Sequence, residues 1–107
     1  MKESKFMWIF VMFDLPTATK KERKKYTEFR RFLLKDGFVM MQYSVYSRIC
    51  KGEDSVQTHK KRVREHLPSK GQVRMLSITD LQYSKMETLV GEKKEEEKLE
   101  KKQLLLF

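Results

Sequence analysis

Asp14 is the residue of this sequence whose position most strongly suggests chemistry. It ends the apolar run Phe6–Phe13 and precedes Leu15 and Pro16. A carboxylate at the end of a core strand is costly if it is dehydrated and unpaired. Asp14 could simply cap the Leu15–Thr19 loop through backbone N–H groups, or it could hold a ligand.

A divalent metal is the ligand that suits Asp14. Mg²⁺ prefers oxygen donors and usually takes one or two carboxylates, while water and phosphate oxygens complete its coordination shell. One carboxylate per chain makes a poor site, but a two-fold axis would bring two copies of Asp14 together at an isologous interface. A water activated by such a metal could attack a phosphodiester.

The other residues that could do chemistry give weaker signals. Cys50 is the single cysteine of the chain, so it cannot form an intrachain disulfide, and it fits a reducing cytoplasm. As a nucleophile it has little support, because no histidine stands close to it in the sequence. His59 and His66 are two helical turns apart, too far to share one metal, and we expect them at an interface or facing solvent.

The strand expected before Asp14 is apolar on both faces, which is typical of a central strand covered on both sides. One layer of helices covers only one face of a sheet. In a chain of 107 residues little is left to build a second sheet, so the pattern favours a homodimer.

A helix is expected to follow directly. The sequence TKKE, Thr19 to Glu22, has the spacing of a capping box, and Gly37 is a suitable residue to end a helix that runs to about Asp36. A second helix is expected at about Ser55–Leu67, ended by Pro68. We expect its apolar residues, Val56, Val63 and Leu67, to face the core.

The remaining segments predict strands. Phe38–Cys50 is rich in β-branched and aromatic residues, and the sequence leaves open whether it bends into two pairing segments. Gln72–Thr79 predicts another strand, and Leu81–Met86 a fourth strand or an irregular edge. This order of elements predicts an α+β, ferredoxin-like (split βαβ) single domain over residues 1–91.

The charge distribution indicates a polyanionic partner. The formal net charge is +9, but residues 92–102 are neutral, so the excess lies on the two expected helices. The alternative is that these basic residues only form a solvent-exposed helix face. The residues of the first helix that we expect to contact phosphate are Lys20, Lys21, Arg23, Lys24, Arg30 and Arg31.

Residues 92–107 form a charged linker followed by an apolar end. Four apolar residues at a chain end should not stay in water, so we expect them to dock as a short strand on a sheet edge of the dimer mate or of another protein. These residues are Leu104, Leu105, Leu106 and Phe107. The run Phe6–Phe13 is too short to span a bilayer and lacks a signal-peptide cleavage site, so we expect no membrane association and a cytoplasmic location.

The stretch FVMFDLPTATKKERKKYTEFRRFLLKDGFVMMQYSVYSR, Phe10 to Arg48, resembles the smaller of the two core CRISPR adaptation proteins, in a type II-like version, a family of CRISPR-associated endoribonucleases or endonucleases. The resemblance implies a ferredoxin-like protomer and a symmetric dimer with facing sheets. It implies that Asp14 is both a catalytic residue and a metal ligand, which binds Mg²⁺ across the interface. It also implies a scaffold that binds duplex DNA for the CRISPR integrase, the larger core adaptation protein, during spacer acquisition.

One position departs from the family pattern. Some members carry an arginine two residues before the Gln of the Q-x-S-V strand, where this sequence has Met40, so a cation that could stabilise the reacting phosphate is missing. Two alternatives stay open: a free-standing, toxin-like mRNA ribonuclease, and a non-catalytic RNA-binding ferredoxin-like module. The second lacks the expected aromatic RNP run. The sequence therefore leaves two candidate substrates, duplex DNA and single-stranded RNA.

Overall fold

The computed structural model describes residues 5–91. The expected docking segment Leu104–Phe107 and the charged run before it lie outside the described residues. The elements, in chain order, are β1 (Met7–Asp14), α1 (Lys20–Lys35), β2 (Val39–Gln42), β3 (Val45–Cys50), α2 (Glu53–Arg64), β4 (Gln72–Thr79) and α3 (Asp80–Ser84). Of the helices within this range, none has the length and apolarity needed to cross a membrane.

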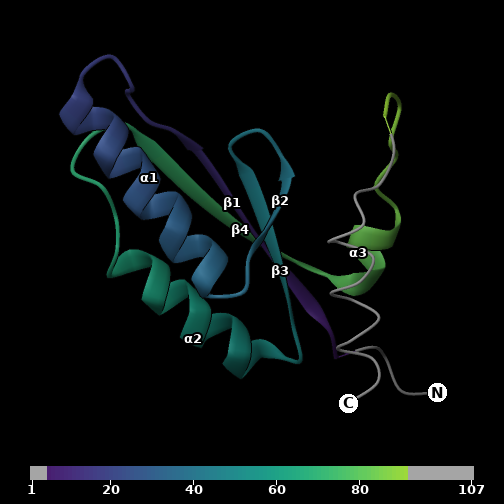
Figure 1. Cartoon of the computed structure of the whole chain (residues 1–107). Helices are drawn as coiled ribbons and strands as arrows, with labels where there is room; N and C mark the ends of the chain where they lie inside the picture. The colour runs from purple at the N-terminus through teal and green to yellow at the C-terminus, as the bar shows by residue number, and fades with distance from the viewer. Residues whose placement is uncertain (1–4, 92–107) are drawn as a thin grey trace.

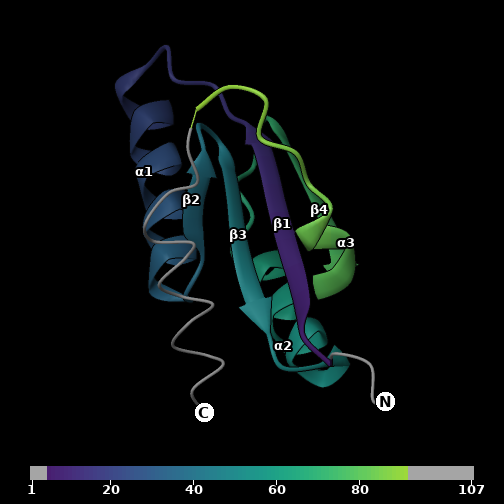
Figure 2. The same cartoon turned by 90° about the vertical axis from the view of Figure 1, so that its right-hand side faces the viewer.

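The four strands form one antiparallel sheet in the order β2-β3-β1-β4. Helices α1 and α2 pack on one face, and α3 lies on the other side (Figure 1). Figure 2 looks onto the face that α1 and α2 leave uncovered. The βαββαβ order with β1 in the centre confirms the ferredoxin-like fold predicted from the sequence.

Two element predictions are settled by local geometry. Phe38–Cys50 does bend into two segments, because Ser44 adopts a positive φ of 61° at the turn between β2 and β3. The expected fourth strand at Leu81–Met86 is wrong, since Thr79 caps a short helix there. The Thr79 hydroxyl accepts from the Gln82 N–H at 3.0 Å, and the Gln82 side chain accepts from the Thr79 N–H at 2.8 Å.

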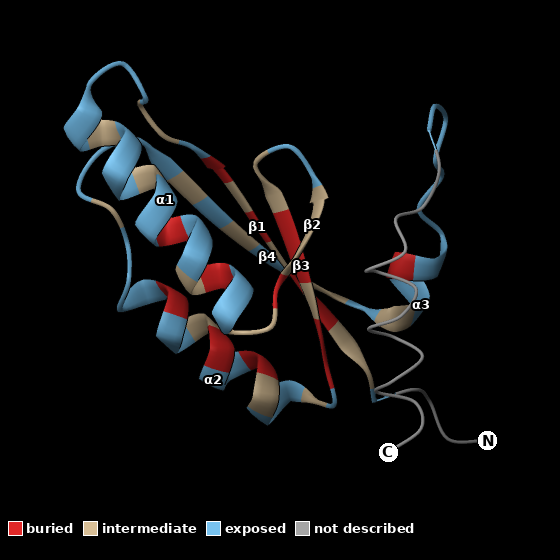
Figure 3. Cartoon of the chain, viewed as in Figure 1, coloured by how far each residue is buried: buried red, intermediate tan, exposed pale blue. Residues whose placement is uncertain are grey.

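The helix-side core lies between the sheet and the two long helices (Figure 3). Alternate residues of β1 point into it, as period-2 alternation requires. The capping box of α1 is present as predicted. The Thr19 hydroxyl accepts from the Glu22 N–H, and the Glu22 carboxylate accepts from the Thr19 N–H. The core residues contributed by β1, α1 and α2 are Ile9, Val11, Phe13, Phe29, Leu33, Val56 and Val63.

The other face of β1 carries Trp8, Phe10, Met12 and Asp14, and we call this side of the sheet the open face. Its N-terminal end is covered by α3 of the same chain: the Trp8 and Tyr83 rings stack with centroids 3.8 Å apart. The Trp8 indole N–H also donates to Asp80 Oδ1 at 2.8 Å. This end of the open face is therefore covered within the chain itself, by α3.

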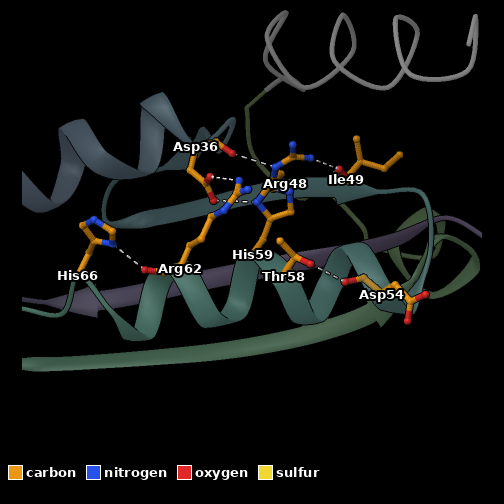
Figure 4. Close-up of polar contacts among 8 residues, drawn as sticks. All are labelled: Asp36, Arg48, Ile49, Asp54, Thr58, His59, Arg62 and His66. Carbon is orange, nitrogen blue, oxygen red and sulfur yellow. Dashed lines mark hydrogen bonds and ion pairs between the residues drawn. The ribbon is translucent and has the colours of Figure 1, made fainter.

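The two long helices are tied together by Asp36, the C-cap residue of α1 (Figure 4). One carboxylate oxygen lies 2.8 Å from Nδ1 of His59 and the other accepts from Arg62 at 2.9 Å. His59 is buried, so its expected position at an interface or in solvent is wrong. Leu67 was expected in the core but is 51% exposed, because α2 ends at Arg64 and the following residues leave the helix.

Gly71 gives a stability prediction at the start of β4. Its φ is +91°, and a Cβ there would lie 2.5 Å from the backbone oxygen of Asp14. We expect Gly71→Ala to lower the free energy of unfolding by about 2–4 kcal/mol, from left-handed strain plus the clash. Gly91→Ala is the matched control, since Gly91 has φ +95° with open space around it. Equal losses in the two variants, measured by urea unfolding, would contradict the clash.

Candidate metal and phosphate site

Asp14 is the last residue of β1 and pairs with Gln72 of β4. Strand alternation puts its carboxylate on the open face with Phe10 and Met12, and it is exposed to solvent. Within residues 5–91 the carboxylate makes no hydrogen bond or ion pair. The alternative that Asp14 caps the loop after β1 is therefore not supported by the structure.

One chain supplies a single carboxylate to this site. Across residues 5–91 there is no group of three or more His, Cys, Asp or Glu residues that could hold a metal ion. An exposed, unpaired Asp14 fits a magnesium ion whose remaining ligands are water, phosphate and a second protein carboxylate. A site completed by a second copy of the chain is compatible with this donor set.

The sequence did not single out Arg74, which lies near Asp14 on β4. Arg74 pairs with Met12 of β1, two residues from Asp14, so both side chains project from the open face. The signal was present in the alternation of QVRMLSIT, where Arg74 falls in the phase of Gln72 and not in that of core-facing Val73 and Met75. That Arg74 lies near Asp14 follows only from the register in which β4 pairs with β1.

Met40, by contrast, faces the other way. It pairs with Tyr46 and packs against the helix-side core. Met40 is therefore part of the hydrophobic packing, and it lies on the face of the sheet opposite to Asp14.

The basic residues predicted on α1 do not gather around Asp14. Lys20, Lys24 and Arg31 lie within about 40° of one another on the helix and opposite its buried residues Phe29 and Leu33. We call these three the α1 stripe. They are exposed and make no side-chain hydrogen bond or ion pair with another described residue. Because α1 covers the helix side of the sheet, the stripe points away from the open face.

The other three basic residues of α1 have different surroundings. The Arg23 guanidinium donates to the carbonyl oxygens of Thr17 and Ala18, at 3.2 and 3.0 Å, and so closes the loop before the helix. Arg30 lies close enough to the Tyr46 phenol for its positive charge to lower the pKa of that group. Lys21 lines a cavity of about 190 Å³ between α1 and the segment that joins α2 to β4. Cys50 is buried in the helix-side core.

Tyr46 predicts how stability depends on alkaline pH. Burial raises the pKa of its phenol above the ordinary value of 10.0, and Arg30 acts in the opposite direction. Below about pH 10 the phenol is protonated in folded and unfolded chains alike. Above it the unfolded chain loses its proton first, so the free energy of unfolding falls as pH rises. We expect Tyr46→Phe to lose less stability than wild type between about pH 9 and pH 11, measured by urea unfolding. Equal losses would contradict this assignment.

Comparisons with known proteins agree with this architecture. The profile of the family described as "CRISPR associated protein Cas2" matches residues 7–86. A protein of Parvibaculum lavamentivorans named "CRISPR-associated endoribonuclease Cas2" is 48% identical over 101 residues, which cover 94% of this chain and 100% of that protein. A protein of the same name from Acidovorax ebreus is 51% identical over 85 residues, 79% of this chain and 83% of that one.

A solved structure described as "Crystal structure of cas2" superimposes with a TM-score of 0.57. The match covers 84% of this chain and 92% of that one at 15% identity. At this identity the likeness shows the shared fold alone.

Proposed function

This chain belongs to the CRISPR-associated Cas2 family, and from that premise we propose that it is a Mg²⁺-dependent nuclease that works as a homodimer. Two copies would pair through their open faces, and the two Asp14 carboxylates would share the metal. The observation that carries the proposal is the exposed Asp14 carboxylate, which has no partner within residues 5–91.

The open face has the character of an interface between copies. Beyond the part covered by α3, Met12 is only half-buried, and Leu76 of β4 is 50% exposed. After α3 the chain continues on this side of the sheet (Figure 1). Its residues Leu89 and Val90 are 85% and 94% exposed. Apolar patches of this kind mark protein–protein contacts.

The residues of this chain would divide the chemistry as follows. Asp14 would bind and orient a divalent cation, which supplies Lewis acidity and a nucleophilic water when it is bound. The antiparallel pairing of β1 with β4 holds the backbone of Asp14 in place, opposite Gln72. The backbone approaches so closely here that a Cβ at Gly71 would lie 2.5 Å from the Asp14 oxygen. Relatives are named endoribonucleases, so single-stranded RNA is the first substrate to test for cleavage.

We propose a second role, as a scaffold that binds duplex DNA for the CRISPR integrase during spacer acquisition. The α1 stripe supports it, because three exposed cations without partners among the described residues follow one helix face. The stripe and Asp14 face opposite sides of the protomer, so DNA binding and cleavage would be separable.

The nuclease proposal is tested by incubating the wild-type protein with single-stranded RNA and with duplex DNA, each with Mg²⁺ and with a chelator. We expect cleavage only with the metal, and a dimer in sedimentation equilibrium. A protein that cuts equally well in chelator, or that sediments as a monomer at every concentration, would overturn the shared-metal site.

The scaffold role predicts a change in salt dependence. Replacing Lys20, Lys24 and Arg31 together by Ala should reduce the slope of log affinity for duplex DNA against log salt by roughly 2 or more, since each phosphate contact contributes about 0.9. Cleavage should be unchanged, because Asp14 lies on the other face. The control is Lys85→Ala, an exposed lysine at the C-cap of α3. An unchanged slope in the triple variant would contradict the proposal that the α1 stripe binds duplex DNA.

A further inference from the structure

We propose that Arg74 binds the phosphate group that is held at Asp14, and that it positions this phosphate for attack. The inference rests on the proposed metal-dependent function and names a further residue of the same site. Met40 cannot supply a cation to this site, because it packs against the helix-side core, whereas Arg74 lies on the same face of the sheet as Asp14.

The register of β1 and β4 carries the argument. Asp14 faces Gln72 and Met12 faces Arg74, so Asp14 and Arg74 are diagonal neighbours on one face of an antiparallel pair. Such neighbours have α-carbons about 7–8 Å apart, within reach of long side chains. A phosphate lying between them could meet the guanidinium on one side and the metal at Asp14 on the other.

Arg74 is also available for a ligand. Its side chain is exposed, and it makes no hydrogen bond or ion pair with another residue of the described range. In particular, the Arg74 guanidinium forms no ion pair with the Asp14 carboxylate, although both side chains project from the same face. Arg23, by comparison, already donates to backbone carbonyls. The fork of donors on a guanidinium matches two oxygens of one phosphate.

No other arginine described on β1 to β4 can take this place. Arg48 lies on the helix side, where its guanidinium donates to the backbone oxygens of Asp36 and Ile49 at 2.9 and 2.7 Å (Figure 4). The α1 stripe points away from the open face. Arg74 is therefore the arginine of the sheet that shares a face with Asp14.

The chemistry needs a fixed cation at this point. In phosphodiester hydrolysis a water oxygen forms a bond to phosphorus while the bond from phosphorus to the leaving oxygen breaks. The water gives up a proton to solvent, and the leaving oxygen takes one from solvent. Negative charge builds up on the non-bridging oxygens as this happens. Arg74 takes no part in the proton transfers because a guanidinium stays protonated, so it acts as a positioning residue.

The first test is single-turnover cleavage with protein in excess and saturating. We expect Arg74→Ala to lower the cleavage rate by about 10²-fold, the loss typical of one removed transition-state donor. Arg74→Lys should recover only part of it, because an ammonium cannot bind two oxygens in one plane. The matched control is Arg64→Ala, which removes an exposed arginine of α2 and should leave the rate unchanged.

The second test is a double-mutant cycle on affinity for a short RNA in Mg²⁺, which reports on the site even without turnover. Arg74→Ala should weaken binding several-fold in the wild-type background and less in the Asp14→Asn background, since both residues hold one phosphate. Equal effects in the two backgrounds, with Mg²⁺-dependent cleavage intact, would overturn the role of Arg74 and leave the nuclease proposal standing.

Two further outcomes are decisive. If wild type neither cuts nor binds RNA better with Mg²⁺, the metal site fails and the role of Arg74 fails with it. If Arg74→Ala sediments as a monomer while wild type is a dimer, Arg74 is an interface residue and the proposal is overturned.

Discussion

Asp14→Asn is expected to reduce Mg²⁺-dependent cleavage by roughly 10³-fold or more, equivalent to about 4 kcal/mol of lost transition-state stabilisation. Asparagine keeps the shape of the side chain but removes the negative charge that binds the metal. The fold should not change, because the carboxylate is exposed and makes no hydrogen bond or ion pair within residues 5–91. The measurement is the single-turnover rate with saturating protein, beside the melting temperature.

Two controls separate this prediction from a general charge effect. Asp54→Asn makes the same chemical change at an exposed position in the first turn of α2 and should leave cleavage intact. A dimer that carries Asp14→Asn in one protomer only should also be strongly impaired, since one carboxylate remains for a shared metal. Half of the wild-type rate in that mixed dimer would show that each protomer works alone, which contradicts the shared site.

Trp8→Ala is expected to have the largest effect on stability, a loss of about 3–5 kcal/mol in the free energy of unfolding. Trp8 is fully buried, stacks on Tyr83 at 3.8 Å, and donates its indole N–H to Asp80. The substitution therefore opens a cavity and removes the contact that holds α3 on the open face. Urea unfolding followed by far-ultraviolet circular dichroism measures the loss.

A graded series tests the cause. Trp8→Phe keeps an aromatic ring against Tyr83 but loses the hydrogen bond to Asp80, so its loss should be smaller than that of Trp8→Ala. Leu89→Ala is the control at a side chain that is 85% exposed, and its effect should stay within about 0.5 kcal/mol. A loss below about 1 kcal/mol for Trp8→Ala would show that α3 contributes little to stability.

Much of the fold follows from local patterns in the sequence. The capping box at Thr19 and Glu22 gave the start of α1, and Gly37 with a positive φ of 89° follows its end. The continuous apolar run gave a central strand that ends at Asp14. These features are readable because capping, glycine conformation and strand burial involve residues close together in the chain. The resemblance over Phe10–Arg48 gave the family.

The errors have two origins. At Leu81–Met86 a strand or irregular edge was expected, but the capping spacing of Thr79 and Gln82, together with stacking of Tyr83 on Trp8, favours a helix. His59 looked like a surface residue of a basic helix, but it is buried against Asp36, twenty-three positions earlier. For His59 the deciding partner is distant in the sequence, whereas α3 combines a local capping box with the distant Trp8 ring.

The sequence by itself determined that Asp14 ends a core strand, that positive charge gathers on helices, and which family the chain resembles. Only the tertiary structure decided that the α1 stripe and Asp14 face opposite sides of the protomer, and that Arg74 shares the face of Asp14. The physical reason is strand register. Because side chains alternate between the two faces, a shift of one residue in the pairing of β1 with β4 would turn Arg74 away from Asp14. That register is fixed by packing across the whole sheet.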